Sequence, residues 1–191
     1  MRSTFLLAAV APAAFVAAAP IEASGPPDAP KITAWSSSGS GCPKDSATKF
    51  NVGPTLGDSA TVSFTGFKGD SSDNCQVHLT LSGGSPGWQV GLKEVTYRGD
   101  AYLKAGTSFR TITTSFWSQD AATTSSFESR LTPSGEFKDS FTLQESAPSP
   151  AWSKCGSGSG IFNVNHRPVI TGNYGTYNIK SAQWRLEWRQ C

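Results

Sequence analysis

Carboxylate side chains are the residues of this chain that could support hydrolysis of a glycosidic bond. That chemistry needs two carboxyl groups about 5–10 Å apart, one acting as an acid and the other as a base or nucleophile. Most of the candidates occupy outward positions of polar, alternating segments, where solvation explains them without catalysis. The sequence therefore assigns no catalytic pair among the candidates Glu94, Asp100, Glu128, Glu136, Asp139 and Glu187.

A Ser-His-Asp arrangement would have to use one of the two histidines, His78 or His166. His78 lies in an alternating segment on a face shared with Gln76 and Thr80, which is typical of a surface or half-buried histidine. His166 precedes Arg167 and a proline and could line a rim. Neither position points to a specific nucleophile, and we assign no catalytic residue.

Metal binding has one weak candidate, the loop segment that contains Asp70, Asp73 and Asn74. Loop oxygens of this kind could hold calcium. Asp and Asn also favour turns for their own reasons, which explains the same residues without an ion. A zinc site would need cysteine pairs two to four residues apart, and the cysteines are not spaced that way. We expect no metal and no cofactor.

The six tryptophans are a surplus that could serve binding, because flat aromatic faces stack on sugar rings. Trp184 and Trp188 alternate with polar residues and are assigned to the core. Three others lie next to Ser-rich or Pro-rich stretches, where either ligand stacking or packing against a disulfide would explain them. The candidate stacking residues are Trp35, Trp117 and Trp152.

The elements that would position these residues are β-strands. Alternating apolar and polar residues are clearest in 60–65, 75–81 and 184–188, and turn clusters such as "SGGSPG" separate further short apolar runs. No convincing helical periodicity occurs after the first 20 residues. We predict an all-β domain over residues 31–191, folded as an antiparallel β-sandwich.

The tripeptide Arg98-Gly99-Asp100 resembles an integrin adhesion signal, which would have to lie on an exposed loop. Its surroundings, "VTYRGDAYL", alternate without turn residues. The sequence therefore predicts that the tripeptide lies within a strand, with Arg98 and Asp100 on the outward face. Gly99 would mark a bulge or a close approach of another backbone.

Four cysteines are an even number, which predicts two disulfides in an oxidising compartment. Three pairings are possible. We favour Cys42 with Cys75 and Cys155 with Cys191, because each half of the chain then closes its own loop.

The N-terminus reads as a secretory signal peptide over residues 1–18, with one basic residue, an apolar run and small residues near Ala18. Residues 19–30 form a flexible, Pro-rich leader in this interpretation. Loss of Arg2 with the signal leaves 15 basic against 14 acidic side chains, since the full chain has 16 and 14. Such a balance offers no electrostatic funnel for nucleic acid or anionic lipid. We expect a secreted, extracellular protein.

Five segments in this order resemble a known family. They are "SGSGCP" at 38–43, "NCQVHLTL" at 74–81, "GWQVGLKEVTYRGDAYLKAG" at 87–106, "WSKCGSG" at 152–158 and "WRLEWRQC" at 184–191. Together they resemble the secreted fungal and bacterial proteins known as domain of unknown function 4360, over residues 30–191. The resemblance implies secretion and a disulfide-linked all-β domain, with no established chemistry. Asp100 departs from the family pattern after "YRG".

Our first functional hypothesis is a monomeric, non-enzymatic extracellular binding protein. Its partner would be a cell-wall polysaccharide or a host protein, the latter making it a candidate effector. The alternative is an extracellular polysaccharide- or ester-cleaving hydrolase whose site residues come from loops. A purely structural wall component would also fit the low charge and the high Ser and Gly content. We expect no nucleic-acid partner and no membrane association.

Overall fold

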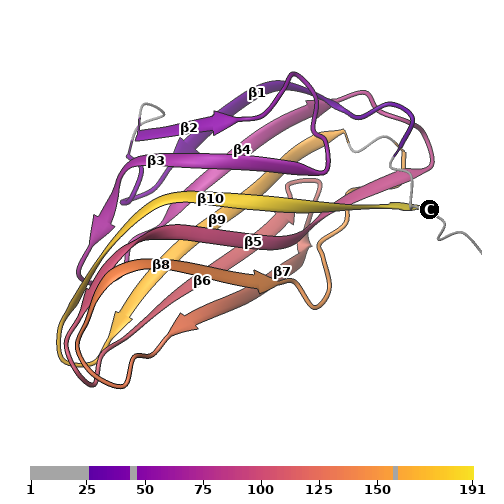
Figure 1. The fold of residues 1–191 in the computed structure, drawn as a ribbon. Helices are drawn as coiled ribbons and strands as arrows, with labels where there is room; N and C mark the ends of the chain where they lie inside the picture. The colour runs from indigo at the N-terminus through magenta and orange to yellow at the C-terminus, as the bar shows by residue number, and fades with distance from the viewer. Residues whose placement is uncertain (1–25, 44–46, 157–158) are drawn as a thin grey trace, which may run out of the picture.

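The computed structural model describes residues 26–43, 47–156 and 159–191, and these residues form two five-stranded antiparallel sheets (Figure 1). The first sheet has the order β1 (Lys31–Ser38), β4 (Cys75–Ser82), β9 (Gly160–Thr171), β6 (Ser108–Trp117) and β7 (Asp120–Leu131). The second has the order β2 (Thr48–Asn51), β3 (Ser59–Gly69), β10 (Gly175–Gln190), β5 (Trp88–Leu103) and β8 (Phe137–Ser146). The predicted antiparallel sandwich is confirmed. The predicted signal peptide lies outside the described residues.

The centre of the second sheet is formed by its two longest strands, β5 and β10, which have 16 residues each. They pair along their whole length, from Gly175 opposite Leu103 to Gln190 opposite Trp88. In Figure 1 both strands cross the front sheet and curve at its lower left end. β3 pairs with the free edge of β10, and β8 pairs with the free edge of β5.

The core lies between the sheets and follows the alternation of the sequence. In β5 the inward positions from Val95 to Leu103 are buried, while the positions between them are partly or fully exposed. Trp184 is fully buried, and Trp188 packs against the core from a partly buried position. The assignment of both tryptophans to the core therefore agrees with the structure.

One part of the core is polar. The inward positions of β6 include Thr111 and Thr113, both 1% exposed. Thr111 shares a hydrogen bond of 2.9 Å with Ser129 of β7. Tyr97 Oη lies 2.7 Å from Thr113 Oγ1 and 2.6 Å from His166 Nδ1, so one phenol links the two sheets through the interior.

His166 is a core residue, and the expectation that it could line a rim is wrong. The alternation of β9 turns Phe162, Val164 and His166 inward together, and His166 is fully buried. Its ring packs edge-on against Phe64 and Tyr97. Burial disfavours the charged imidazolium and lowers the pKa of His166 to about 3.

The burial of neutral His166 predicts acid sensitivity. Because the pKa of His166 is lowered in the folded state, the unfolded chain binds a proton that the native state does not bind, between about pH 6.5 and about pH 3. Stability is therefore lost as pH falls below about 6.5. Going from pH 7 to pH 5 should lower the free energy of unfolding by about 2 kcal/mol through this residue.

Urea titrations of the wild type and of His166→Leu at the two pH values measure this effect. In His166→Leu, the free energy of unfolding should change less between pH 7 and pH 5 than it does in the wild type, by most of the predicted loss. This difference does not depend on how much the substitution itself destabilises the protein. An equal pH dependence in both proteins would show that His166 is not the group responsible.

Two disulfides fasten the ends of strands. Cys42, in the loop after β1, bonds to Cys75 at the start of β4, with 5.2 Å between Cα atoms. Cys155, in the loop after β8, bonds to Cys191, which follows β10, with 5.9 Å between Cα atoms. This is the pairing that the sequence favours. Two disulfides are characteristic of an oxidising, extracellular environment.

The β-domain begins before β1. Asp28 N–H donates to Ser85 Oγ, and Ser85 N–H donates to the carbonyl of Asp28. Pro30 is buried, and its carbonyl accepts from Leu56 N–H. Asp28 and Pro30, at the end of the segment expected as a leader over residues 19–30, therefore contact the β-domain. Among the described residues, no helix has the length and apolarity that crossing a membrane requires.

Candidate functional site

A hollow in the described surface crosses the second sheet, with a volume of about 860 Å³ and a wide opening to solvent. Strands β10, β5 and β8 each contribute three consecutive residues, which are 176–178, 100–102 and 138–140. Strand β3 contributes Lys68 and Gly69, and Asp70 follows directly after it. Pockets that hold small ligands commonly have volumes of about 300–1,000 Å³. The lining residues lie at the start of β8 and β10 and at the ends of β3 and β5, and these strand ends meet at the curved end of the front sheet in Figure 1.

The strand register arranges these residues in rows. The middle residues, Gly69, Tyr177, Ala101 and Asp139, are partners across the four strands. Tyr177 and Ala101 turn their side chains into the core, so backbone forms the floor of the hollow between them. The neighbouring positions on each strand therefore face outward on either side of this floor.

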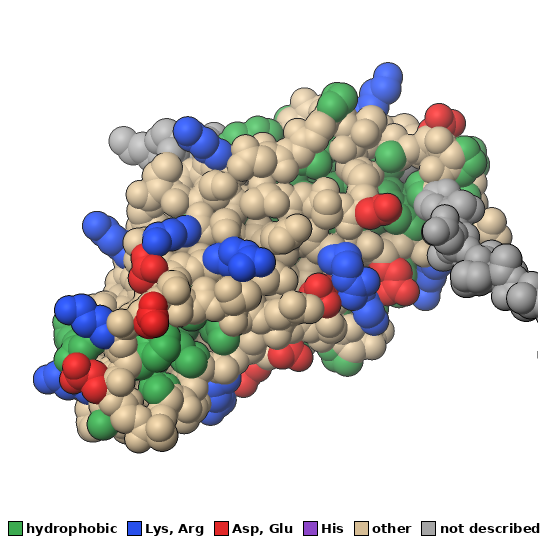
Figure 2. All heavy atoms as spheres, viewed as in Figure 1, with side chains coloured by type: hydrophobic (Ala, Val, Ile, Leu, Met, Phe, Trp, Pro, Cys, Tyr) green, Lys and Arg blue, Asp and Glu red, His purple; other side chains and the backbone are tan. Residues whose placement is uncertain are grey.

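The two outward rows form the walls of the hollow. One wall follows the register Lys68, Asn178, Asp100 and Ser140. The other follows Thr176, Tyr102 and Lys138, with Asp70 at the β3 end. Hydroxyl, amide, carboxylate and ammonium groups therefore line both sides. Figure 2 shows acidic and basic side chains interspersed over this face, next to apolar or aromatic groups at its lower left end.

Tyr102 is an aromatic residue in the lining of the hollow, and Tyr174 lies next to it, outside the lining. Their ring centroids are 6.1 Å apart in an edge-on arrangement, and Tyr174 is 46% exposed. Lys104 places its ammonium 5.5 Å from the Tyr174 ring. The Tyr102 hydroxyl donates to Glu136 at 3.3 Å. Partial burial and the nearby Glu136 carboxylate raise the pKa of Tyr102.

The carboxylates around the hollow are already engaged within the protein. Asp100 forms an ion pair with Lys180 at 2.5 Å. Asp139 Oδ1 accepts from Ser140 N–H at 2.6 Å. Both carboxylates therefore have partners within the protein.

The other candidate carboxylates pair on the surface outside the hollow. Glu128 lies between Arg110 and Arg130, and Glu187 lies 3.8 Å from Lys93. Glu94 accepts from Arg185 at 3.3 Å. The hydrogen bond from Arg185 lowers the pKa of Glu94.

The Arg98-Gly99-Asp100 tripeptide lies inside β5, between β10 and β8, and the predicted strand placement is confirmed. Arg98 donates to Thr142 Oγ1 at 3.3 Å on the outward face. A Cβ atom at Gly99 would lie 2.2 Å from the carbonyl oxygen of Asn178 and 3.0 Å from a ring carbon of Phe141. Gly99 is therefore required by the close approach of β10.

Gly99→Ala should destabilise the protein by about 1–3 kcal/mol, because backbone atoms of β10 cannot move aside without disturbing the central pairing. Gly66→Ala on β3 is the matched control, since a Cβ there meets nothing within 4 Å. Urea unfolding of both variants checks this. Equal stabilities would show that the β5–β10 contact is looser than the structure has it.

The three candidate tryptophans are dispersed. Trp35 on β1 is 37% exposed and lies 6.4 Å from Phe50. Trp152 is partly buried, and the guanidinium of Arg189 lies 4.1 Å above its ring. Trp117 is 2% exposed, stacks on Phe162 and donates from its indole to the carbonyl of Ala151. The hypothesis that Trp117 offers a stacking face is therefore wrong.

The candidate calcium residues form internal contacts. Tyr177 Oη donates to Asp73 Oδ2 at 2.6 Å, and Asn74 contacts Ser40. Burial, and then the Asp73 carboxylate, raise the pKa of Tyr177. Asp70 lines the hollow. Within the described ranges, no three His, Cys, Asp or Glu side chains are grouped closely enough to hold a metal ion.

The family described as Domain of unknown function (DUF4360) matches residues 28–191. The chain belongs to this family. The match begins at Asp28, whose backbone bonds to Ser85, so it covers the whole β-domain. A search of curated proteins found no match.

Two solved structures resemble the DUF4360 domain distantly. One is TmCBM61 in complex with beta-1,4-galactotriose, with 12% identity, a TM-score of 0.33 and coverage of 81% of this chain and 90% of that one. The other is the enzymatically active domain of bacteriophage CBA120 tailspike protein 4, with 14% identity and a TM-score of 0.25. The similarity covers 84% of this chain and 20% of the tailspike domain. At these TM-scores no functional inference follows.

Four residues in or next to the hollow were not identified from the sequence as candidate site residues: Tyr102, Tyr174, Asn178 and Lys138. Tyr102 continues the alternation that puts Arg98 and Asp100 on the outward face, and that shared face was the available signal. Asn178 and Lys138 could not be joined to them, because their proximity depends on β10 and β8 flanking β5.

Proposed function

We propose that this DUF4360 protein is a secreted polysaccharide-binding protein that holds a sugar chain across β3, β10, β5 and β8. The observation that supports this most directly is the open hollow with polar walls and with Tyr102 in its lining, next to the exposed ring of Tyr174. A sugar ring presents an apolar face and a polar edge, and this combination matches it. The interspersed charges favour a neutral ligand over a highly charged one.

Binding explains the hollow better than hydrolysis. Asp70, Asp100 and Asp139 line it, but Lys180 neutralises Asp100 and the Ser140 backbone holds Asp139. An acid catalyst would need a carboxyl group whose pKa is raised. The Asp100 carboxylate, which lies in an outward row, is suited instead to accept hydrogen bonds from sugar hydroxyls.

Removing the aromatic face should weaken binding. Purified mature protein is incubated with insoluble chitin and, separately, insoluble β-glucan, and the bound fraction gives the apparent Kd. Tyr102→Ala should raise this Kd about tenfold, equivalent to about 1.4 kcal/mol. Thr96→Ala, an outward β5 substitution outside the hollow, is the matched control and should leave binding unchanged.

Trp35→Ala separates the two aromatic hypotheses, since Trp35 lies on the other sheet. Loss of binding in this variant but not in Tyr102→Ala would reject the hollow as the site. Release of reducing sugar during the incubation would favour the hydrolase instead.

Export is part of the proposal. It rests on the apolar N-terminal segment and on the two disulfides, which match an oxidising compartment. N-terminal sequencing of protein recovered from the growth medium tests it. A start close to residue 19 supports cleavage after the signal peptide, and a start at Met1 contradicts it.

A further inference from the structure

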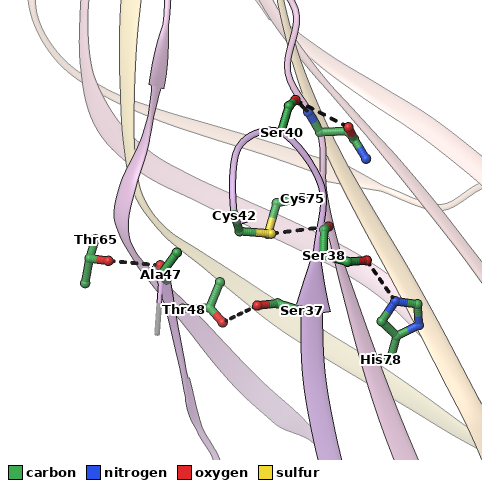
Figure 3. The surroundings of a disulfide bond; sticks show 10 residues. Ser37, Ser38, Ser40, Cys42, Ala47, Thr48, Thr65, Cys75 and His78 are labelled. Carbon is green, nitrogen blue, oxygen red and sulfur yellow. Dashed lines mark hydrogen bonds between the residues drawn. A yellow bond between two sulfur atoms is a disulfide. The ribbon is translucent and has the colours of Figure 1, made fainter. Parts of the chain in front are cut away.

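Three neighbouring strands of the first sheet bring a serine, a histidine and an asparagine into line on its outer face. His78 of β4 is the register partner of Asn163 of β9, and Ser38 ends β1 on the other side. Ser38 Oγ lies 3.2 Å from His78 Nε2. Asn163 Oδ1 lies 2.7 Å from His78 Nδ1. Figure 3 shows the Ser38 hydroxyl directed at the His78 ring beside the Cys42–Cys75 disulfide.

The surroundings of Asn163 determine which ring nitrogen carries the proton. Asn163 Nδ2 donates to Ser118 Oγ at 2.8 Å and to the carbonyls of Ile161 and Phe116 at 3.3 and 3.5 Å. Carbonyl oxygens only accept, so the amide nitrogen must face them and Oδ1 must face His78. Neutral His78 therefore carries its proton on Nδ1 and presents an unprotonated Nε2 to the Ser38 hydroxyl.

The backbone holds Ser38 in this position. Gly39 follows it with φ of +130°, and a Cβ there would lie 2.2 Å from the carbonyl oxygen of Asn74. Gly41 N–H donates to the same carbonyl at 2.9 Å. Cys42 and Cys75 then fasten the turn to the strand that carries His78. Ser38 is exposed, so a substrate can approach it.

We infer that Ser38, His78 and Asn163 form a nucleophilic site for acyl transfer from small, accessible carboxylic esters. A base hydrogen-bonded to a serine, and itself oriented by a third group, is the arrangement that activates such a hydroxyl. Ser38 Oγ attacks the ester carbonyl, and His78 Nε2 takes its proton. The bond to the leaving alcohol breaks, the alcohol receives that proton, and an acyl-Ser38 ester remains. Water then hydrolyses this ester with His78 again as the base.

This site is separate from the hollow and does not rest on polysaccharide binding. Its residues belong to β1, β4 and β9, whereas the hollow belongs to β3, β10, β5 and β8. Ser38 and His78 would be catalytic residues. Asn163 is a positioning residue that acts through the tautomer of His78.

A fluorophosphonate probe tests the nucleophile directly. Ser38 Oγ forms the bond to phosphorus, fluoride leaves, and His78 accepts the hydroxyl proton. Peptide mass spectrometry should place the adduct on Ser38. Ser38→Ala should abolish this adduct, while Ser40→Ala, two residues further along and bonded to Asn74, should retain it. Removing the base in His78→Ala should slow labelling about 100-fold.

The same variants are assayed with p-nitrophenyl acetate, and release of p-nitrophenol should fall in parallel with labelling. Nitrogen chemical shifts of His78 provide the positioning readout. They should report the Nδ1–H form in the wild type and a loss of that preference in Asn163→Leu. Native-like disulfides and circular dichroism confirm that each variant is folded.

An adduct on any other residue, or no adduct under conditions that label a known serine esterase, would overturn the inference. Labelling of Ser38 at an unchanged rate in folded His78→Ala would also overturn it. Loss of p-nitrophenyl acetate hydrolysis with unchanged polysaccharide binding in Ser38→Ala would separate this activity from the proposed binding function.

Discussion

The pairing of β5 with β10 is the constraint on which the rest of the second sheet depends. The two 16-residue strands set the register for β3 and β8, which pair on either side of them. Their inward side chains supply much of the core, and their outward side chains supply the centre of the hollow. Because side chains alternate between faces, a slip of one residue would exchange these two sets. Gly99 has no Cβ atom, which allows the β10 backbone at Asn178 to lie close to β5.

The interior of this sandwich is less apolar than its alternating sequence suggests. Tyr97, Thr113 and His166 connect the sheets by hydrogen bonds instead of apolar packing alone. His166 Nε2 is buried and has no partner in the described structure. A buried polar atom of this kind costs stability, and the Tyr97 contact at Nδ1 offsets only part of the cost. The Cys42–Cys75 disulfide adjoins this layer, because Cys75 of β4 is the register partner of His166, and the Cys155–Cys191 disulfide fastens the residue that follows β10.

The sequence was sufficient for the fold class because period-two alternation survives in nearly every strand. It also placed Arg98-Gly99-Asp100 in a strand and Trp184 in the core. It misassigned Trp117 because a neighbouring Ser-rich stretch does not reveal that the alternation of β6 turns this side chain inward. The same limit applies to His166.

Sites built across strands could not be predicted in this way. The hollow and the Ser38–His78–Asn163 arrangement both join strands that are distant along the chain, such as β4 and β9. Alternation identifies the face on which a residue lies but contains nothing about which strand is its neighbour. Strand order therefore had to be known before either site could be seen.

The central claim is that the outward rows on β3, β10, β5 and β8 bind a sugar chain. The most direct measurement is a titration of isotope-labelled mature protein with soluble oligosaccharide, followed by amide chemical shifts. The account predicts that saturable shifts concentrate at residues 68–70, 100–102, 138–140 and 176–178. Shifts concentrated on the first sheet around Trp35, or no saturable shifts with any oligosaccharide of a polymer that the protein retains, would contradict it.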